Sequence, residues 1–119
     1  MFKIGATQRE GYVELVCRGP ANLANFRNLI DRVRGGEFGD ENTRKYLIDL
    51  RPISGTIATL ERFELGGYIG KSVPHLKIAA ISKKETHSKL GENVAVNRGA
   101  NILATDDENE AKAWLVAEK

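Results

Sequence analysis

Hydrophobic and polar positions alternate in two short segments at the start of the chain. Apolar residues recur at every second position in 2–7 and again in 12–18, and the residues between them end in Gly11, which suits a tight turn. Alternation of this kind is typical of strands with one buried face. We therefore expect an antiparallel hairpin at the N-terminus.

Two later segments, 45–51 and 77–82, are apolar almost without interruption. Such runs indicate strands that are covered on both faces, as in the middle of a parallel sheet. A shorter strand is expected at 101–105. Asp49 ends the first of these runs, and because a buried carboxylate is costly without a partner, we expect Arg51, Lys83 or a backbone amide to pair with it.

Four segments carry apolar residues at helical spacing. The first lies around 23–33 and ends at two glycines, the second covers 57–70, the third and weakest covers 86–98, and the last ends near Leu115. The last helix has capping-box spacing at Thr105 and Glu108, or alternatively at Asp107 and Glu110, and its Trp114 is expected in the core.

The order is therefore strand, strand, helix, followed by three strand and helix units. This order predicts an α/β fold with a mostly parallel five-stranded sheet, an antiparallel N-terminal strand and four helices. At 119 residues the chain is long enough for one domain, 1–119, with a core of its own.

The helix over 57–70 is unusual because it is apolar on two sides. Leu60, Phe63 and Gly67 lie on one side, and Ala58, Leu65 and Ile69 lie nearly opposite. One side is expected to meet the sheet. The other must cover a neighbouring helix, line a cleft, or be offered to a partner, a lipid, a bilayer or a second subunit.

Two adjacent glycines, Gly66 and Gly67, disfavour this helix and predict a hinge or a frayed end. We expect it to form a movable pair with the helix that starts near Thr86, over an apolar groove. The expected ligand or partner contacts are Leu60, Phe63, Leu65, Tyr68, Ile69, Lys83 and His87.

The turn 52–56 joins a buried strand to this helix at the edge of the sheet where ligands of open α/β sheets bind. Ser54, Gly55 and Thr56 form a candidate phosphoacceptor or anion site, since a helix start favours negative charge. The alternative is that Ser54 or Thr56 simply caps the helix.

The composition of the chain and the motifs it lacks exclude several classes of function. The formal charge of +2 is too balanced for a nucleic-acid footprint, and Cys17, the single cysteine, is expected to be a buried hydrophobe. No metal-ligand spacing, phosphate loop or catalytic constellation occurs, so we expect no enzyme, cofactor or metal. The chain also lacks a secretory signal and an apolar run long enough to span a membrane, which predicts a cytoplasmic protein with at most peripheral membrane contact.

Five segments together resemble the SpoIIAA-like proteins, small bacterial domains of the STAS class whose fold is related to the lipid-carrying CRAL-TRIO domains. The segments are 46–51, 60–63, 77–81, 97–102 and 110–115. The resemblance implies a non-enzymatic domain that binds protein partners, nucleotides or lipids. It also places Ser54 where anti-sigma factor antagonists carry a phosphorylated serine, although the turn here is shorter and lacks the acidic residue before the serine.

Overall fold

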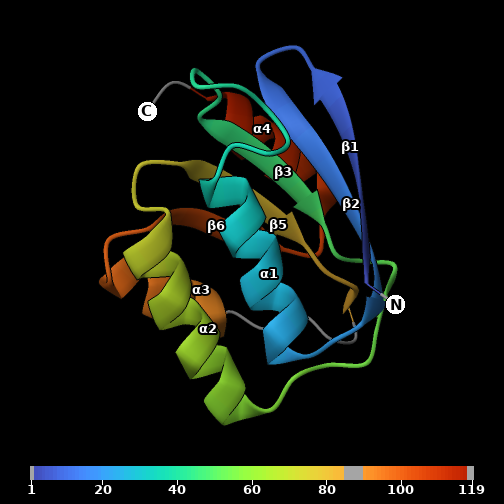
Figure 1. Cartoon of the computed structure of the whole chain (residues 1–119), viewed down its shortest axis with the longest axis vertical. Helices are drawn as coiled ribbons and strands as arrows, with labels where there is room; N and C mark the ends of the chain where they lie inside the picture. The colour runs from blue at the N-terminus through green and yellow to red at the C-terminus, as the bar shows by residue number, and fades with distance from the viewer. Residues whose placement is uncertain (1, 85–89, 118–119) are drawn as a thin grey trace.

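The computed structural model describes residues 2–84 and 90–117. The elements follow the predicted order, with one additional short strand (Figure 1). They are β1 Lys3–Arg9, β2 Tyr12–Pro20, α1 Leu23–Arg34, β3 Lys45–Asp49, β4 Ile53–Ser54, α2 Thr59–Ser72, β5 Lys77–Ile81, α3 Leu90–Asn97, β6 Asn101–Thr105 and α4 Glu108–Val116.

The main sheet has the strand order β1-β2-β3-β5-β6. β1 and β2 form the predicted antiparallel hairpin, in which Gly11 adopts a positive φ of 89° at the turn. The other neighbours in this sheet run parallel, and β3 and β5 lie inside it, as their apolar runs predicted. The α/β fold with a mostly parallel sheet is confirmed.

Strand β4 was not predicted. Its two residues pair in parallel with Gly19 and Pro20 at the end of β2, so the segment that looked like a plain turn is attached to the sheet. A strand of two residues has no periodicity that a sequence can display.

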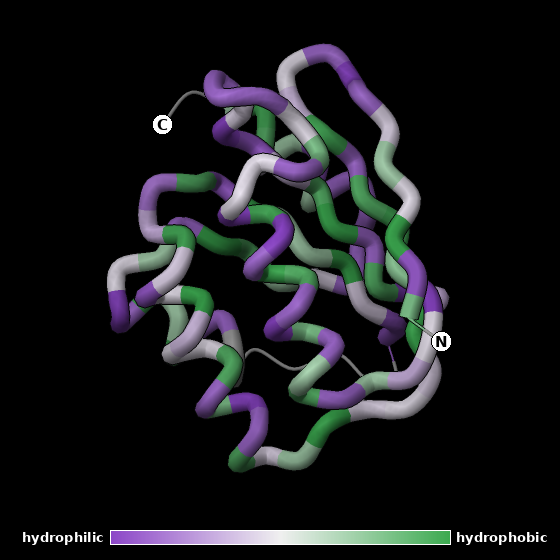
Figure 2. Tube along the Cα trace, viewed as in Figure 1, coloured by the Kyte–Doolittle hydropathy of each residue, from purple (hydrophilic) through white to green (hydrophobic). Residues whose placement is uncertain are grey.

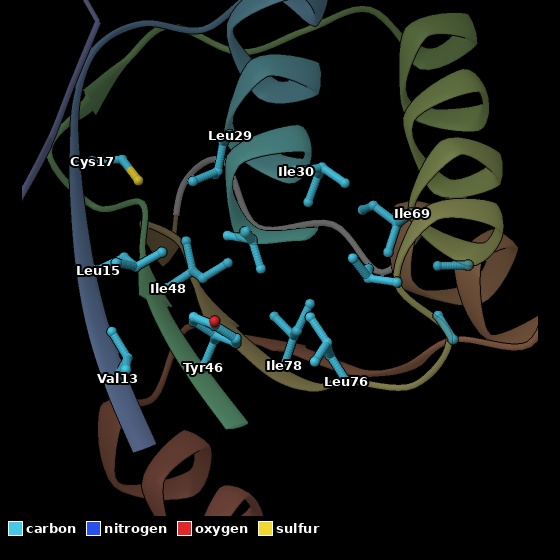
Figure 3. Close-up of a cluster of buried hydrophobic side chains, with 14 of the residues drawn as sticks. Val13, Leu15, Cys17, Leu29, Ile30, Tyr46, Ile48, Ile69, Leu76 and Ile78 are labelled. Atoms are coloured by element: carbon cyan, nitrogen blue, oxygen red, sulfur yellow. The ribbon is translucent and has the colours of Figure 1, made fainter. Parts of the chain in front are cut away.

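The helices divide between the two faces of the sheet. α1, α2 and α3 cover one face and α4 covers the other (Figure 1). Because side chains alternate along a strand, Tyr46 and Ile48 enter the larger core beneath α1 and α2, whereas Leu47 packs against α4. Figure 3 shows Leu29, Ile30 and Ile69 pointing from the helices toward the strand residues of this larger core.

The pattern of hydropathy follows these layers. The central strands carry the longest hydrophobic stretches, and the turn between β1 and β2 is hydrophilic (Figure 2).

Cys17 is buried in the larger core, as predicted, and burial raises the pKa of its thiol to about 12, which keeps it protonated and unreactive. Trp114 is half-buried at the border of the smaller core, above the ammonium group of Lys77.

The helix starts differ from the prediction in one case. Asp107, the second of the two predicted N-caps, caps α4 by accepting hydrogen bonds from the amides of Asn109 and Glu110. Its own amide donates to the hydroxyl of Thr105 at 3.1 Å rather than to Glu110, so the reciprocal half of the predicted capping box is not formed. α2, however, begins only at Thr59. Its N-cap is Ala58, whose amide is bonded by the carboxylate of Glu61 at 2.9 Å, so the prediction that Ser54 or Thr56 caps this helix is wrong.

Candidate functional site

An ion-pair network occupies part of the carboxyl edge of the sheet. The guanidinium of Arg51 donates to both oxygens of Asp49, at 2.9 and 2.8 Å, and also to Glu108 at 2.9 Å. Burial would raise the pKa of Asp49, but the hydrogen bonds from the side chain and amide of Arg51 lower it below its usual range. The predicted pairing of Asp49 with Arg51 is confirmed.

Beside this network, an apolar pocket lies between α2 and the carboxyl ends of the strands. It encloses about 180 Å³ on the face that carries α1, α2 and α3. Its walls come from the loop after β2, α1, the segment after β3, α2, the ends of β5 and β6, and α3. The lining residues are Ala21, Phe26, Leu50, Ile53, Gly55, Thr56, Ile57, Arg62, Leu65, Ile69, Ala80, Ser82, Glu92, Ile102 and Ala104.

Small side chains on two neighbouring strands leave this space open. Ala80 on β5 and Ala104 on β6 are paired directly across the sheet, and both line the pocket. One pair earlier on the same face, Ile78 and Ile102 fill the equivalent space. The change from isoleucine to alanine along both strands therefore produces a hollow beneath α2.

The polar groups of the pocket are held in place by the protein. Arg62 donates from Nε to the carbonyl of Ile57 at 3.3 Å and from Nη2 to the hydroxyl of Thr56. The carboxylate of Glu92 accepts a hydrogen bond from the amide of Ala104 at 3.2 Å. Their contacts fix these two charged groups at the wall of an otherwise largely apolar space.

The two apolar sides of α2 have different surroundings. Leu65 and Ile69 face inward, packing in the larger core and lining the pocket. Leu60 and Phe63, on the other side, are exposed by 77% and 50%. Helix α2 is continuous through Gly66 and Gly67, with no break or frayed end at these glycines.

α2 and α3 form the predicted helix pair, and a glycine sets their close approach. A Cβ atom on Gly70 would collide with the Cβ of Arg98 and lie 3.1 Å from the carbonyl oxygen of Ala95. A Cβ on Gly67, in contrast, would meet only the Nη1 atom of Arg98, at an ordinary 3.5 Å. Packing within the chain requires the first of these glycines and not the second.

The predicted anion site is divided in the structure. Ser54 lies exposed on β4 and donates its hydroxyl hydrogen to the carbonyl of Gly19 at 3.2 Å. Gly55 has a positive φ of 79°, and Thr56 is bonded to Arg62. All three precede the start of α2, so their amides are not the unpaired amides of its first turn.

Two further predicted contacts, Tyr68 and Lys83, lie apart from the pocket. Tyr68 is half-buried between α1 and α2, where its hydroxyl bonds to Asp31 and its ring lies under Arg27 and Lys71. Lys83 is exposed just after β5, and His87 lies outside the described residues. The structure thus brings together Leu65, Ile69 and the 55–57 segment and leaves Leu60, Phe63, Tyr68 and Lys83 outside the pocket.

Sequence reasoning missed Arg62, Ala80 and Ala104. The signal for the alanines was available, because both stand near the carboxyl ends of strands whose preceding residues on the same face are isoleucines. Arg62 had no such signal, since a charged residue on an exposed helix turn is unremarkable.

Two solved structures are similar to this chain over nearly their whole lengths. An anti-sigma factor antagonist from Mycobacterium paratuberculosis superimposes with a TM-score of 0.65 at 8% identity, covering 98% of this chain and 96% of that one. An uncharacterized protein of the DUF3478 family with a SpoIIAA-like fold, from Shewanella loihica PV-4, superimposes with a TM-score of 0.51 at 19% identity, covering 96% and 93%. The chain has a SpoIIAA-like fold.

The SpoIIAA-like fold confirms the resemblance that the five sequence segments indicated. No protein-family model matches the chain, and neither does any curated protein. At such low identities a SpoIIAA-like fold says nothing about activity, which has to be argued from the site.

Within 2–84 and 90–117, no helix is long and apolar enough to cross a membrane, and no group of metal-ligating side chains comes together.

Proposed function

We propose that this protein is a non-enzymatic binding domain that holds the apolar part of a lipid-like ligand in the pocket beneath α2. The apolar pocket itself carries the proposal. An apolar cavity of roughly 150 Å³ is large enough to bind benzene in another protein, and the space here is about 180 Å³. It also lies at the carboxyl edge of the parallel strands, where open α/β sheets place their ligands.

The polar groups of the pocket suit binding better than catalysis. Arg62 and Glu92 are the ionisable side chains among its described lining residues. An arginine stays protonated in proteins, so it is a poor proton donor or acceptor in catalysis. The guanidinium of Arg62 is instead placed to orient the polar end of a ligand.

Helices α2 and α3 would move together if the pocket opens wider for a longer ligand, because their backbones are in close contact at Gly70. As part of the same proposal, the protein works in the cytoplasm and collects its ligand by peripheral contact with the inner face of the membrane.

Filling the pocket should abolish binding without unfolding the protein. With the apolar fluorophore 1-aminoanthracene as the probe, we expect the wild type to bind in a fluorescence titration and Ala104→Leu to bind at least about tenfold more weakly, a loss of about 1.4 kcal/mol. The melting temperature should not fall much, since the added side chain enters empty space. Ala80→Leu provides a second variant in case Ala104→Leu folds poorly.

Leu60→Ser is the matched control, because it removes an exposed apolar side chain of the same helix without touching the pocket. It should bind the probe as the wild type does. Absence of binding by the wild type, or equal binding by a folded Ala104→Leu protein, contradicts the proposed function.

A second candidate function, partner switching by phosphorylation, is favoured by the exposed hydroxyl of Ser54 and by the similarity to an anti-sigma factor antagonist. A phosphate adds about −1.5 to −2 charges and would replace the bond from Ser54 to the carbonyl of Gly19. We then expect one phosphate by intact-mass analysis of protein from its native cytosol. The adduct should vanish in Ser54→Ala and persist in Thr56→Ala, and its persistence in Ser54→Ala would rule out this serine.

A further inference from the structure

A second concave surface lies on the outer side of α2, away from the apolar pocket. It is an open groove of about 440 Å³ bounded by α1, by α2 and by the residue that follows α3. We call it the outer groove. Its lining residues are Arg27, Phe63, Glu64, Gly67, Tyr68, Lys71 and Arg98.

Two aromatic rings give the outer groove an apolar surface. Phe63 is half-exposed, and it continues the exposed side of α2 that starts at Leu60 one turn earlier. Tyr68 is fixed by the bond from its hydroxyl to Asp31, with the cationic groups of Arg27 and Lys71 at 5.3 and 5.6 Å from the centre of its ring. Hot spots of protein–protein interfaces are enriched in aromatic residues and arginine, and this groove contains both.

The charge of the outer groove is positive. Glu64 is its one acidic lining residue, and Arg27 already pairs with it at 3.2 Å. Lys71 and Arg98 form no ion pair with any residue of the described ranges. Two cations therefore remain to meet carboxylates from outside.

Gly67 makes the outer groove deeper than an ordinary helix surface. Glycine disfavours a helix, and the packing of this chain does not require it here, because an added Cβ would touch only the flexible end of Arg98. A glycine that internal packing does not need, between an exposed phenylalanine and two cations that form no ion pair within the described ranges, leaves room for a side chain that comes from another molecule.

We propose that the outer groove docks an acidic segment of a protein partner, with an aromatic or leucine side chain of the partner seated over Gly67 against Phe63. Carboxylates on either side of that anchor pair with Lys71 and Arg98. The anchor supplies apolar contact, and the charges select acidic partners over basic ones.

An anionic membrane is a weaker match for the same cations. Polybasic membrane-binding sites gather about four to eight lysines and arginines, whereas this groove offers Arg27, Lys71 and Arg98, the first already paired. A concave surface also fits a single inserted side chain better than it fits a flat bilayer.

Selection from a random-peptide library displayed on phage tests the proposal without knowledge of the natural partner. Peptides selected on the wild-type protein should be enriched in aspartate and glutamate beside phenylalanine, tryptophan or leucine. Fluorescence anisotropy of a selected peptide should then show binding at least about tenfold weaker to Lys71→Glu/Arg98→Glu and to Gly67→Leu.

Two control variants distinguish the outer groove from the rest of the protein surface and from the inner pocket. Lys3→Glu/Lys84→Glu makes the same change of charge at exposed positions elsewhere and should bind the peptide normally. Ala104→Leu should also keep peptide binding, because it fills only the inner pocket, so this result is independent of the proposed function.

Selection of peptides without acidic residues, or equal binding by Gly67→Leu, overturns the proposal. So does charge-dependent co-sedimentation with phosphatidylglycerol vesicles when no peptide is selected.

Discussion

Replacing Arg51 with methionine is expected to lower the free energy of unfolding at neutral pH by about 3 kcal/mol, since it leaves the buried carboxylate of Asp49 without its partner. Asp49 is only 8% exposed, and Arg51 holds both of its oxygens. This expected loss of stability is at the low end for a broken buried ion pair. The side chain of Arg51 is partly exposed, and its amide still donates a hydrogen bond to Asp49 at 3.0 Å.

The loss of stability in Arg51→Met should change with pH, because the pKa of Asp49 determines when its carboxylate is charged. In the wild type this pKa lies below its unfolded value of about 3.9, so the pairing stabilises the protein fully above that value and is lost as the pH falls through the folded pKa. Without Arg51, burial raises the pKa of Asp49, and protonation then relieves the penalty as the pH falls. The difference between the two proteins is therefore largest near neutral pH and shrinks toward acid.

Urea unfolding of both proteins across a series of pH values measures this difference. Glu108→Gln serves as the control, because it removes the more exposed partner of Arg51 and should cost at most about 1 kcal/mol. A loss in Arg51→Met that is constant with pH would show that packing of the arginine stem, rather than its charge, stabilises the edge of the sheet.

The two glycines of α2 should respond to alanine in opposite ways. Gly70→Ala is expected to destabilise the protein by about 2 kcal/mol, since the new methyl group collides with the Cβ of Arg98, which cannot move without the backbone of that residue. Gly67→Ala should instead stabilise it by about 0.5 to 1 kcal/mol, because it gains helix propensity and meets only the mobile end of the same arginine.

Thermal and urea unfolding of the two variants provide a matched comparison, since they introduce the same methyl group one turn apart on one helix. Circular dichroism should show that both remain folded. If Gly70→Ala stabilises the protein as Gly67→Ala does, α2 and α3 do not pack as closely as the structure indicates. Equal destabilisation by both would mean that Gly67 also has a packing role within the chain.

The fold could be predicted because its signals are local. The hairpin, the buried strands β3 and β5, the strand β6 and the four helices each follow from a spacing of apolar residues that a single segment displays. The pairing of Asp49 was predictable for a related reason, as Arg51 stands two residues away and a buried carboxylate needs a partner.

The start of α2 shows where local reasoning failed. Hydroxyl residues before a helix usually cap it, yet Ser54 is held by the carbonyl of Gly19, which is far away in the sequence. This contact accompanies the pairing of β4 with β2, and the helix then begins later, at Thr59, with an alanine as its N-cap. A tertiary contact overrode a good local preference.

The sequence by itself determined that α2 is apolar on two sides, since that property depends only on the spacing of residues along one helix. Only the tertiary structure decided that Leu65 and Ile69 face a pocket and that Leu60 and Phe63 face solvent. The reason is physical. The pocket depends on alanines of two strands lying opposite α2, and the outer groove is lined by residues of α1, of α2 and by Arg98, so both are formed by segments far apart in the sequence that only the packed chain brings together.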